Sequence, residues 1–277
     1  MYIVGMEARR SMRNAIMLGP EMTALDARNT MLRYGISRVV VGRKKKALGI
    51  VTEKDVARFM YEQVPMRELA ETRLDEIMSQ RLVTVPGETD VRECARLMLS
   101  KGISSLVVVD GSKNLEGIIT KTDLVTAYVE HYSMEHKVHE FMTSKVVTVV
   151  PTEPIHSAIM LMRGNEISRV VVTEKDRVVG IVTGRDLLPL GGLMIGRFGR
   201  QSKAARPFIP SGVKEFMLVS DVMTPNPITT DPNADLADAA YIMMRNRISG
   251  LPVVGNRKSL KGLVTKTDVV RALSKHK

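Results

Sequence analysis

The chain is poor in cysteine and in aromatic residues. Among its 277 residues there is one cysteine and no tryptophan, and aromatic residues make up only 4%. A single cysteine excludes an internal disulfide and a metal cage built from several cysteines, which agrees with a reducing compartment. The scarcity of aromatic rings leaves few platforms on which the bases of single-stranded nucleic acid could stack.

Long apolar runs are missing as well. The longest stretches without charge, such as residues 187–196, fall well short of the roughly 18 apolar residues that a membrane span requires. Residues 1–20 carry three arginines and lack the apolar run of a secretory signal. We therefore expect a cytoplasmic protein without a membrane partner.

No catalytic constellation is visible in the sequence. No nucleophile has a base beside it, and no acids are paired at a useful spacing. His136 and His139 lie three residues apart and could clip a metal, but no carboxylate-rich or cysteine partners accompany them, and His131 lies out of phase. We therefore expect no enzyme, no catalytic cofactor and no metal site.

The composition is rich in positive charge, with 41 lysines and arginines against 30 aspartates and glutamates. The formal net charge is +11, which favours a phosphate-bearing ligand, a nucleic acid or an acidic protein surface as partner. Part of this charge lies in a turn at residues 43–46 and in a basic, Gly/Pro-containing insertion at residues 191–219. A solvated turn and a solvated insertion are the default interpretations, and contact with nucleic-acid phosphates is the sharper alternative.

One short motif occurs four times. Each copy is an apolar strand that begins with glycine, ends on threonine and opens a helix with an aspartate three residues later. The copies are Gly49–Asp55, Gly117–Asp123, Gly180–Asp186 and Gly262–Asp268. Because the motif recurs in register with other features, we interpret the chain as an internal repeat.

The repeating unit predicts the order strand, helix, strand, strand, helix. The copies can be aligned on a serine, at Ser37, Ser104, Ser168 and Ser249. Twenty positions before each serine lies a short strand-like run, at Met17, Thr84, Thr148 and Thr229. The helices are expected to end at Gly35 and Gly102, and near Asn165 and Asn246, residues that tolerate the left-handed conformation. We place the repeats at 1–63, 76–132, 139–190 and 220–277.

Odd and even copies differ in a regular way. From the serine to the motif threonine there are 15 residues in copies 1 and 3 and 16 in copies 2 and 4. Only copies 1 and 3 carry an arginine after the serine and a basic residue before the aspartate, namely Arg38, Arg169, Lys54 and Arg185. We therefore expect a duplicated two-unit module whose phosphate-binding charge is concentrated in copies 1 and 3.

The Thr-x-x-Asp element has two interpretations. A threonine before a helix with an acid three residues later forms a capping box, which stabilises a helix by roughly 1 kcal/mol. The same helix N-terminus suits a phosphate, and an aspartate can accept hydrogen bonds from both hydroxyls of a ribose. The apolar residues Ile50, Ile118, Ile181 and Leu263 can flank a flat base.

The four units resemble CBS domains, and their Gly-apolar-x-Thr-x-x-Asp elements are similar to the adenine-nucleotide signature of that family. The resemblance covers nearly the whole chain outside the basic insertion and the termini. It implies an α+β fold in which repeats pair into two Bateman modules and the modules form a disc with up to four nucleotide sites. The nucleotide-binding gamma subunit of AMP-activated kinase is similar in this respect.

The resemblance also assigns residue roles. Ribose would be held by Asp55, Asp123, Asp186 and Asp268. Phosphate or ribose would be bound by Thr52, Thr120, Thr183 and Thr265. Backbone near Met17, Thr84, Thr148 and Thr229 would contact the adenine edge. The pairs Ser37-Arg38 and Ser168-Arg169 match a His-Arg pair that reaches phosphates in the gamma subunit, and the serine here puts the role of that histidine in doubt.

We therefore expect a non-enzymatic, energy-sensing regulator that binds AMP, ADP or ATP in clefts between paired repeats and signals to a protein partner or to a second disc. The alternative is a nucleic-acid-binding regulator whose basic loops contact phosphates and whose CBS sites receive a ligand. In a third interpretation the chain is a scaffold in which the motifs are helix caps only.

Overall fold

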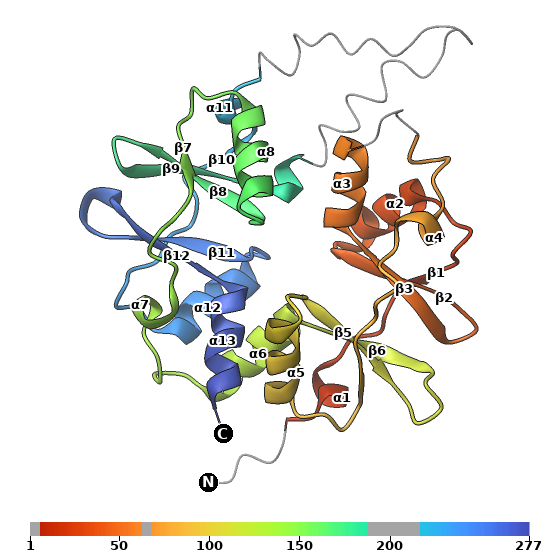
Figure 1. The fold of residues 1–277 in the computed structure, drawn as a ribbon. Helices are drawn as coiled ribbons and strands as arrows, with labels where there is room; N and C mark the ends of the chain where they lie inside the picture. The colour runs from red at the N-terminus through yellow and green to blue at the C-terminus, as the bar shows by residue number, and fades with distance from the viewer. Residues whose placement is uncertain (1–5, 63–67, 188–216, 277) are drawn as a thin grey trace, which may run out of the picture.

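The computed structural model describes residues 6–62, 68–187 and 217–276. Within these ranges the chain forms four copies of one α+β unit, as the sequence predicts (Figure 1). Repeat 1 contains β1 (Met17–Leu18), α2 (Ala24–Tyr34), β2 (Arg38–Arg43), β3 (Lys46–Thr52) and α3 (Glu53–Glu62). Repeat 2 contains β4 (Thr84–Pro86), α5 (Val91–Ser100), β5 (Ser105–Val109), β6 (Leu115–Thr120) and α6 (Lys121–His131).

The second half follows the same order. Repeat 3 contains β7 (Thr148–Val149), α8 (Ile155–Gly164), β8 (Arg169–Glu174) and β9 (Arg177–Thr183), after which residues 184–187 are helical. Repeat 4 contains α12 (Leu236–Arg245), β11 (Gly250–Val254), η1 (Asn256–Lys258), β12 (Leu260–Thr265) and α13 (Lys266–Lys275). A short helix precedes each set of elements, namely α1 (Ala8–Ser11), α4 (Leu74–Ile77), α7 (Val138–Phe141) and α11 (Val219–Val222), the last followed by β10 (Thr224–Pro225).

In repeats 1 to 3 a short parallel strand joins an antiparallel hairpin, in the orders β1-β2-β3, β4-β5-β6 and β7-β8-β9. The valine run at the centre of each sheet is buried, as Val39, Val40 and Val41 show. Such continuous apolar runs fit strands that are covered on both faces.

Repeat 4 departs from this pattern at its first strand. Thr229 was expected in a strand, but it lies outside one, and only Thr230 makes an isolated bridge, to Val253. In repeats 1 to 3 the amide of Val40, or its counterpart, donates to the carbonyl of the residue just before the first strand, for example to Ile16 O at 3.0 Å. Repeat 4 has Pro252 at that place, and proline has no amide proton to donate.

The helices end close to the predicted residues, and only the conformation expected of the asparagines in repeats 3 and 4 is wrong. Gly35 and Gly102 have positive φ as expected, but in repeats 3 and 4 the left-handed residues are Glu166 and Arg247 rather than Asn165 and Asn246. Each asparagine instead donates from Nδ2 to the carbonyl four residues earlier, at 2.9 Å. Asparagine therefore terminates these helices through its side chain, and the residue after it takes the strained conformation.

The hairpin turns account for the alternating spacing. In repeats 1 and 3 two residues with positive φ make the turn, Lys44 and Lys45 in one and Lys175 and Asp176 in the other. In repeat 2 a longer turn is built on the Asp110 carboxylate, which accepts from the amides of Ser112 and Asn114. The extra residue between serine and threonine thus belongs to this longer turn in repeat 2, and repeat 4 has η1 at the same place.

The four short helices are exchanged between paired repeats. The segment before repeat 1 packs on repeat 2, where Arg13 bridges to Ile118, and the segment before repeat 2 packs on repeat 1, where Ser79 bridges to Ile50. The segments before repeats 3 and 4 exchange in the same way, through the bridge from Thr143 to Leu263 and the pairing of β10 with β9. Repeats 1 and 2 therefore form one module, and repeats 3 and 4 form the other.

The two modules meet through repeats 2 and 4. Helices α5 and α6 pack against α12 and α13, and the buried side chains of these two repeats form one continuous core (Figure 1). Repeats 1 and 3 each have a separate core. Among the described residues, every helix is too short or too polar to span a bilayer.

Candidate functional site

All four Thr-x-x-Asp elements form the same hydrogen-bonded cap. In each, the aspartate Oδ2 accepts from the threonine amide at 2.7–2.9 Å and from the threonine hydroxyl at 2.6–2.7 Å. The structural interpretation of the motif is therefore correct for every copy. Because the cap uses Oδ2 in every copy, only Oδ1 of the aspartate is left to bind other groups.

That second oxygen has different neighbours in repeats 2, 3 and 4. Asp123 and Asp268 are only 3% exposed, and their Oδ1 atoms accept from Arg13 Nε at 2.6 Å and from Arg271 at 2.8 Å. Asp186 is partly exposed, and its Oδ1 lies 3.5 Å from the Thr224 hydroxyl, the limit for a hydrogen bond. Oδ1 of the repeat 3 aspartate therefore accepts a weaker hydrogen bond than Oδ1 of the aspartates in repeats 2 and 4.

The glycine that begins each motif makes room for a methionine from the paired repeat. A Cβ on Gly49, Gly117, Gly180 or Gly262 would lie less than 3 Å from a methionine sulfur, those of Met78, Met12, Met223 and Met142 respectively. Each of these methionines directly follows one of the exchanged helices. The motif glycine is thus a packing requirement of the module as well as part of a signature.

A cleft of about 2210 Å³ lies between the repeats and is lined by residues of all four. It gathers the serine of every repeat, both Ser-Arg pairs and the motif residues of repeat 3. The predicted site residues that line it are Ser37, Arg38, Thr52, Lys54, Ser104, Ile118, Thr120, Ser168, Arg169, Ile181, Thr183, Arg185, Asp186 and Ser249. Those that do not are Met17, Ile50, Asp55, Thr84, Asp123, Thr148, Thr229, Leu263, Thr265 and Asp268.

Arg38 and Arg169 hold equivalent positions at the centre of this cleft. Arg38 donates to its own Ser37 and, at 3.0 Å, to Ser104 of repeat 2. Arg169 donates to Ser168 and, at 3.0 Å, to Ser249 of repeat 4. Each arginine therefore joins the two serines of its module, and both serines accept from a guanidinium.

Gly250 lies directly beside the guanidinium of Arg169. A Cβ added there would collide with the arginine NH1. Repeat 2 has Ser105 at the same register, where Arg38 reaches Ser104. A Cβ at this register is thus compatible with the arginine-to-serine contact, and the glycine of repeat 4 is not required for it.

Sequence reasoning missed two lysines of the cleft. Lys121 donates to the Thr267 hydroxyl at 2.9 Å, and Lys266 donates to the Thr122 hydroxyl at 3.0 Å, so the two reach across between repeats 2 and 4. Both are the first residue of a helix after the motif threonine. The odd-even pattern predicted that phosphate-binding charge is concentrated in repeats 1 and 3, whereas repeats 2 and 4 also place a cation in the cleft. The Lys-Thr-Asp sequence that copies 2 and 4 share could have indicated these two lysines.

Burial perturbs all four of these cations. Desolvation lowers the pKa of Arg169 to about 10 and that of Lys266 to about 8, and it also lowers the pKa of Arg38 and Lys121. Among the described residues none of the four is in a salt bridge. A cluster of desolvated cations without paired acids favours binding of an anion.

Beside this centre, the repeat 3 motif faces the exchanged segment of repeat 4. The cleft is lined there by Ile181, Thr183 and Asp186 on one side and by Thr224 and Ile228 on the other. Ile228 is the repeat 4 counterpart of Ile16, whose carbonyl accepts the amide of Val40. Because Pro252 cannot donate, the carbonyl of Ile228 does not receive that bond.

The other candidates from the sequence have structural roles or lie outside the described residues. The basic turn at residues 43–46 contacts its surroundings through an ion pair of Arg43 with Glu21 at 2.8 Å and a hydrogen bond from Lys46 to Ser112 O. His139 lies 3.0 Å from Pro232 O and is not grouped with His136. Most of the basic insertion, residues 191–216, lies outside the described residues.

The family comparison matches most of the chain. The model for the CBS domain matches residues 9–62, 74–130, 138–190 and 219–275. Each matched range contains one copy of the Gly-apolar-x-Thr-x-x-Asp motif and one Ser-apolar hairpin.

Similar proteins come from archaea and plants. Protein MJ1225 of Methanocaldococcus jannaschii is 25% identical over 86% of this chain and 87% of its own length. Its crystal structure, described as that of a proposed archaeal homologue of g-AMPK, matches with a TM-score of 0.81 over 96% of this chain and 99% of that one, at 23% identity. CBSX1, a chloroplastic CBS domain-containing protein of Arabidopsis thaliana, is 30% identical over 70% of this chain and 86% of its own length.

Proposed function

This chain belongs to the CBS-domain family, and we propose that it is a non-enzymatic regulator that binds adenine nucleotides in the cleft between its repeats. Two CBS modules surround one cleft, and the crystal structure of MJ1225, which shares this fold, is described as that of a proposed archaeal homologue of g-AMPK. AMP, ADP and ATP are the ligands that the groups of the cleft fit. Binding would be reported to a protein partner or to a second copy of the assembly.

The observation that carries the proposal is the cluster of Arg38, Arg169, Lys121 and Lys266. Four partly buried cations from four repeats share one cleft without a salt bridge among the described residues. Isolated buried charge is costly, and a ligand phosphate can compensate several of these cations at once. Nucleotides with more phosphates should gain more from this cluster.

The repeat 3 motif is the best-equipped place for the nucleoside. Asp186 has an incompletely satisfied Oδ1 for a ribose hydroxyl, and Ile181 and Ile228 offer apolar contact to a base. Asp123 and Asp268 are buried beneath arginines, so a ribose there would have to displace Arg13 or Arg271. We therefore propose that the site at Thr183 and Asp186 fills first.

Ligand binding changes the protein only through different affinities for two arrangements. The repeats that border the cleft belong to both modules, and Arg185 of repeat 3 lies 3.5 Å from Glu53 of repeat 1. A ligand that engages cations of both modules favours the arrangement in which they are close. This gives the proposed regulator its two states.

Isothermal titration with adenosine, AMP, ADP and ATP tests the proposal. Arg169→Ala should weaken ATP binding by roughly 10- to 150-fold, because a hydrogen bond to a charged group contributes about 1.5–3 kcal/mol. Adenosine binding should change little. Arg177→Ala, on the exposed end of the same hairpin, is the matched control and should retain wild-type affinity.

Equal losses for adenosine and ATP in Arg169→Ala would contradict the phosphate role. A thermal-shift screen with AMP, ADP, ATP, NAD and S-adenosylmethionine tests the ligand class, since a ligand that binds only the folded chain raises the melting temperature. If none of them does, the motifs are helix caps only. Salt-dependent binding of DNA or RNA would instead support the nucleic-acid alternative, which no contact among the described residues favours.

A further inference from the structure

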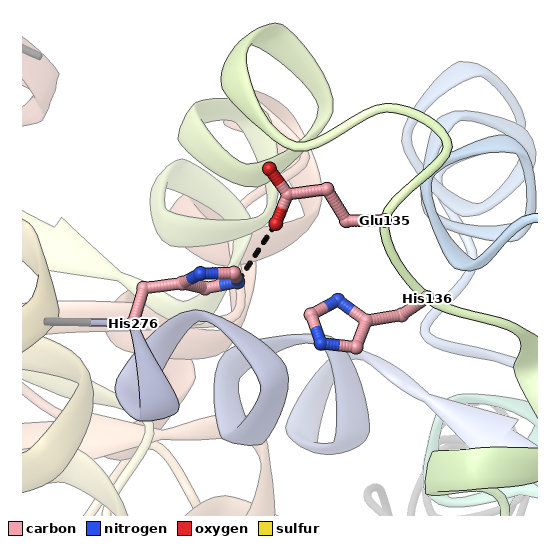
Figure 2. A group of neighbouring side chains, drawn as sticks. All are labelled: Glu135, His136 and His276. Atoms are coloured by element: carbon pink, nitrogen blue, oxygen red, sulfur yellow. Dashed lines mark ion pairs between the residues drawn. The ribbon is translucent and has the colours of Figure 1, made fainter. Parts of the chain in front are cut away.

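Three potential metal ligands meet where the two modules are connected. Glu135 and His136 lie in the loop between α6 and α7, and His276 directly follows α13 (Figure 2). One carboxylate oxygen and one ring nitrogen from each histidine lie within 4.8 Å of one another. The sequence paired His136 with His139, whereas the fold pairs it with a histidine 140 residues away.

The separation of two of these groups is that of ligands on one ion. Glu135 Oε2 and His276 Nε2 are 3.6 Å apart, too far for a good hydrogen bond. In a tetrahedral zinc site with bonds of about 2.0–2.2 Å, neighbouring ligand atoms are about 3.3–3.6 Å apart. A small movement of His136 would complete three ligands around one position.

A second observation points to a ligand at the same place. Nε2 of His276 is buried and has no hydrogen-bond partner among the described residues. Its ring is stacked on Tyr132 with centroids 4.0 Å apart, so the nitrogen is directed by packing rather than by a polar contact. A buried polar atom without a partner is uncommon and indicates an additional group.

The surroundings hold both histidines in place. The Tyr128 hydroxyl lies 2.9 Å from Nδ1 of His136, and Arg96 donates to the main-chain oxygen of His276 at 3.1 Å. When Nδ1 of His136 carries the proton and donates to the tyrosine, Nε2 keeps the lone pair that a metal requires.

We propose that Glu135, His136 and His276 bind a divalent transition-metal ion, with Zn²⁺ the best match. Two imidazoles and one carboxylate suit zinc and leave a fourth position for water. Such an ion would join the loop between the modules to the end of α13, which itself packs on α5 and α6 of repeat 2. The site is distinct from the central cleft and does not depend on the nucleotide proposal.

Titration of Zn²⁺ into untagged, chelator-treated, full-length protein tests this site. We expect one ion per chain and a loss of affinity of at least tenfold in His276→Ala and His136→Ala. Tyr128→Phe, which removes the partner of a ligand, should weaken binding by about 10-fold. His139→Ala is the matched control, because that histidine is exposed on the neighbouring helix α7, and it should bind zinc as the wild type does.

Absence of saturable zinc binding would overturn the proposal, as would unchanged affinity in His276→Ala. A general loss of structure is separated from a loss of ligand by Glu135→Gln, since this side chain is exposed and its replacement keeps the shape. Glu135→Gln should keep the metal-free melting temperature and lose affinity. The visible absorption of bound Co²⁺ should appear in the wild type and in His139→Ala but not in Glu135→Gln.

Discussion

The four cations of the cleft show how single residues acquire properties that the sequence does not display. Lys266 is the first residue of a helix and is exposed in any isolated helix, yet packing of repeats 2 and 4 buries most of it beside Arg169. The Thr-x-x-Asp cap is different, because all its partners lie within four residues. Local chemistry therefore predicted the cap, and only the tertiary fold revealed the lysine.

Lys266 gives a test through pH. Its pKa is lowered from 10.5 to about 8, first by desolvation and then by Arg169. Between pH 8 and pH 10.5 the unfolded chain binds more protons at this residue than the folded chain, so its contribution to the free energy of unfolding rises with pH. Below pH 8 both states are protonated and the contribution is constant.

We expect the melting temperature of the wild type, relative to Lys266→Met, to increase by a few degrees from pH 7 to pH 10. About 1 kcal/mol corresponds to roughly 2–4 °C for chains of 150–250 residues. Lys261→Met, on an exposed position of the preceding strand, should show no such change relative to the wild type. A pH-independent difference for Lys266→Met would mean that the lysine is solvated.

At the scale of elements, the sequence predicts the repeating unit but not the exchange of short helices. Strands and long helices carry periodic apolar patterns, and these were sufficient to find the unit. The exchanged helices have four residues each, too few for a periodic signal, and their partners are distant in the chain. The motif glycines were recognised as part of a signature, while their contact with Met12, Met78, Met142 and Met223 was not.

Alanine substitutions at two glycines can distinguish the close packing at a motif glycine from the general effect of replacing glycine. Gly117→Ala places a Cβ 2.7 Å from the carbonyl oxygen of Arg13, in an exchanged segment. Overpacking of this kind destabilises by about 1–3 kcal/mol. Gly184→Ala has no neighbour within 4 Å and lies in a helix, so it should stabilise by about 0.5–1 kcal/mol.

Denaturant unfolding of the two variants checks this contrast. Gly117→Ala should lower the midpoint, and Gly184→Ala should leave it unchanged or raise it. If both variants unfolded at the wild-type midpoint, the approach of the exchanged segment to the sheet would be looser than the structure shows.

At the scale of the whole molecule, the alternation of odd and even copies predicted two modules, and the exchanged segments explain the pairing. The sequence did not predict that repeats 2 and 4 share one core while repeats 1 and 3 have separate ones. That difference depends on which helix faces meet, and the helices that meet belong to segments far apart in the chain. Pattern alone therefore gives the modules but not their contact.

The shared core predicts how a single module behaves. A fragment of residues 1–134 would expose the faces of α5 and α6 that normally cover α12 and α13. Because those helices occupy equivalent positions in the second module, a second copy of the fragment can replace them. We expect a dimer by light scattering, since exposed apolar surfaces of this size drive association. A monomer at micromolar concentration would show that the contact depends on features unique to repeat 4.

The exchange of segments also determines the order in which contacts form while the chain is being synthesised. Arg13 contacts Asp123, 110 residues later, so at roughly 5–20 residues per second the segment around α1 waits about 5–20 s for its partner. Repeat 1, in contrast, receives α4 as soon as the chain passes Met78, because that segment follows it directly. Repeat 1 can therefore be completed on the ribosome while α1 is still unpaired. Packing of α1 on repeat 2 is then the last step in the assembly of the first module.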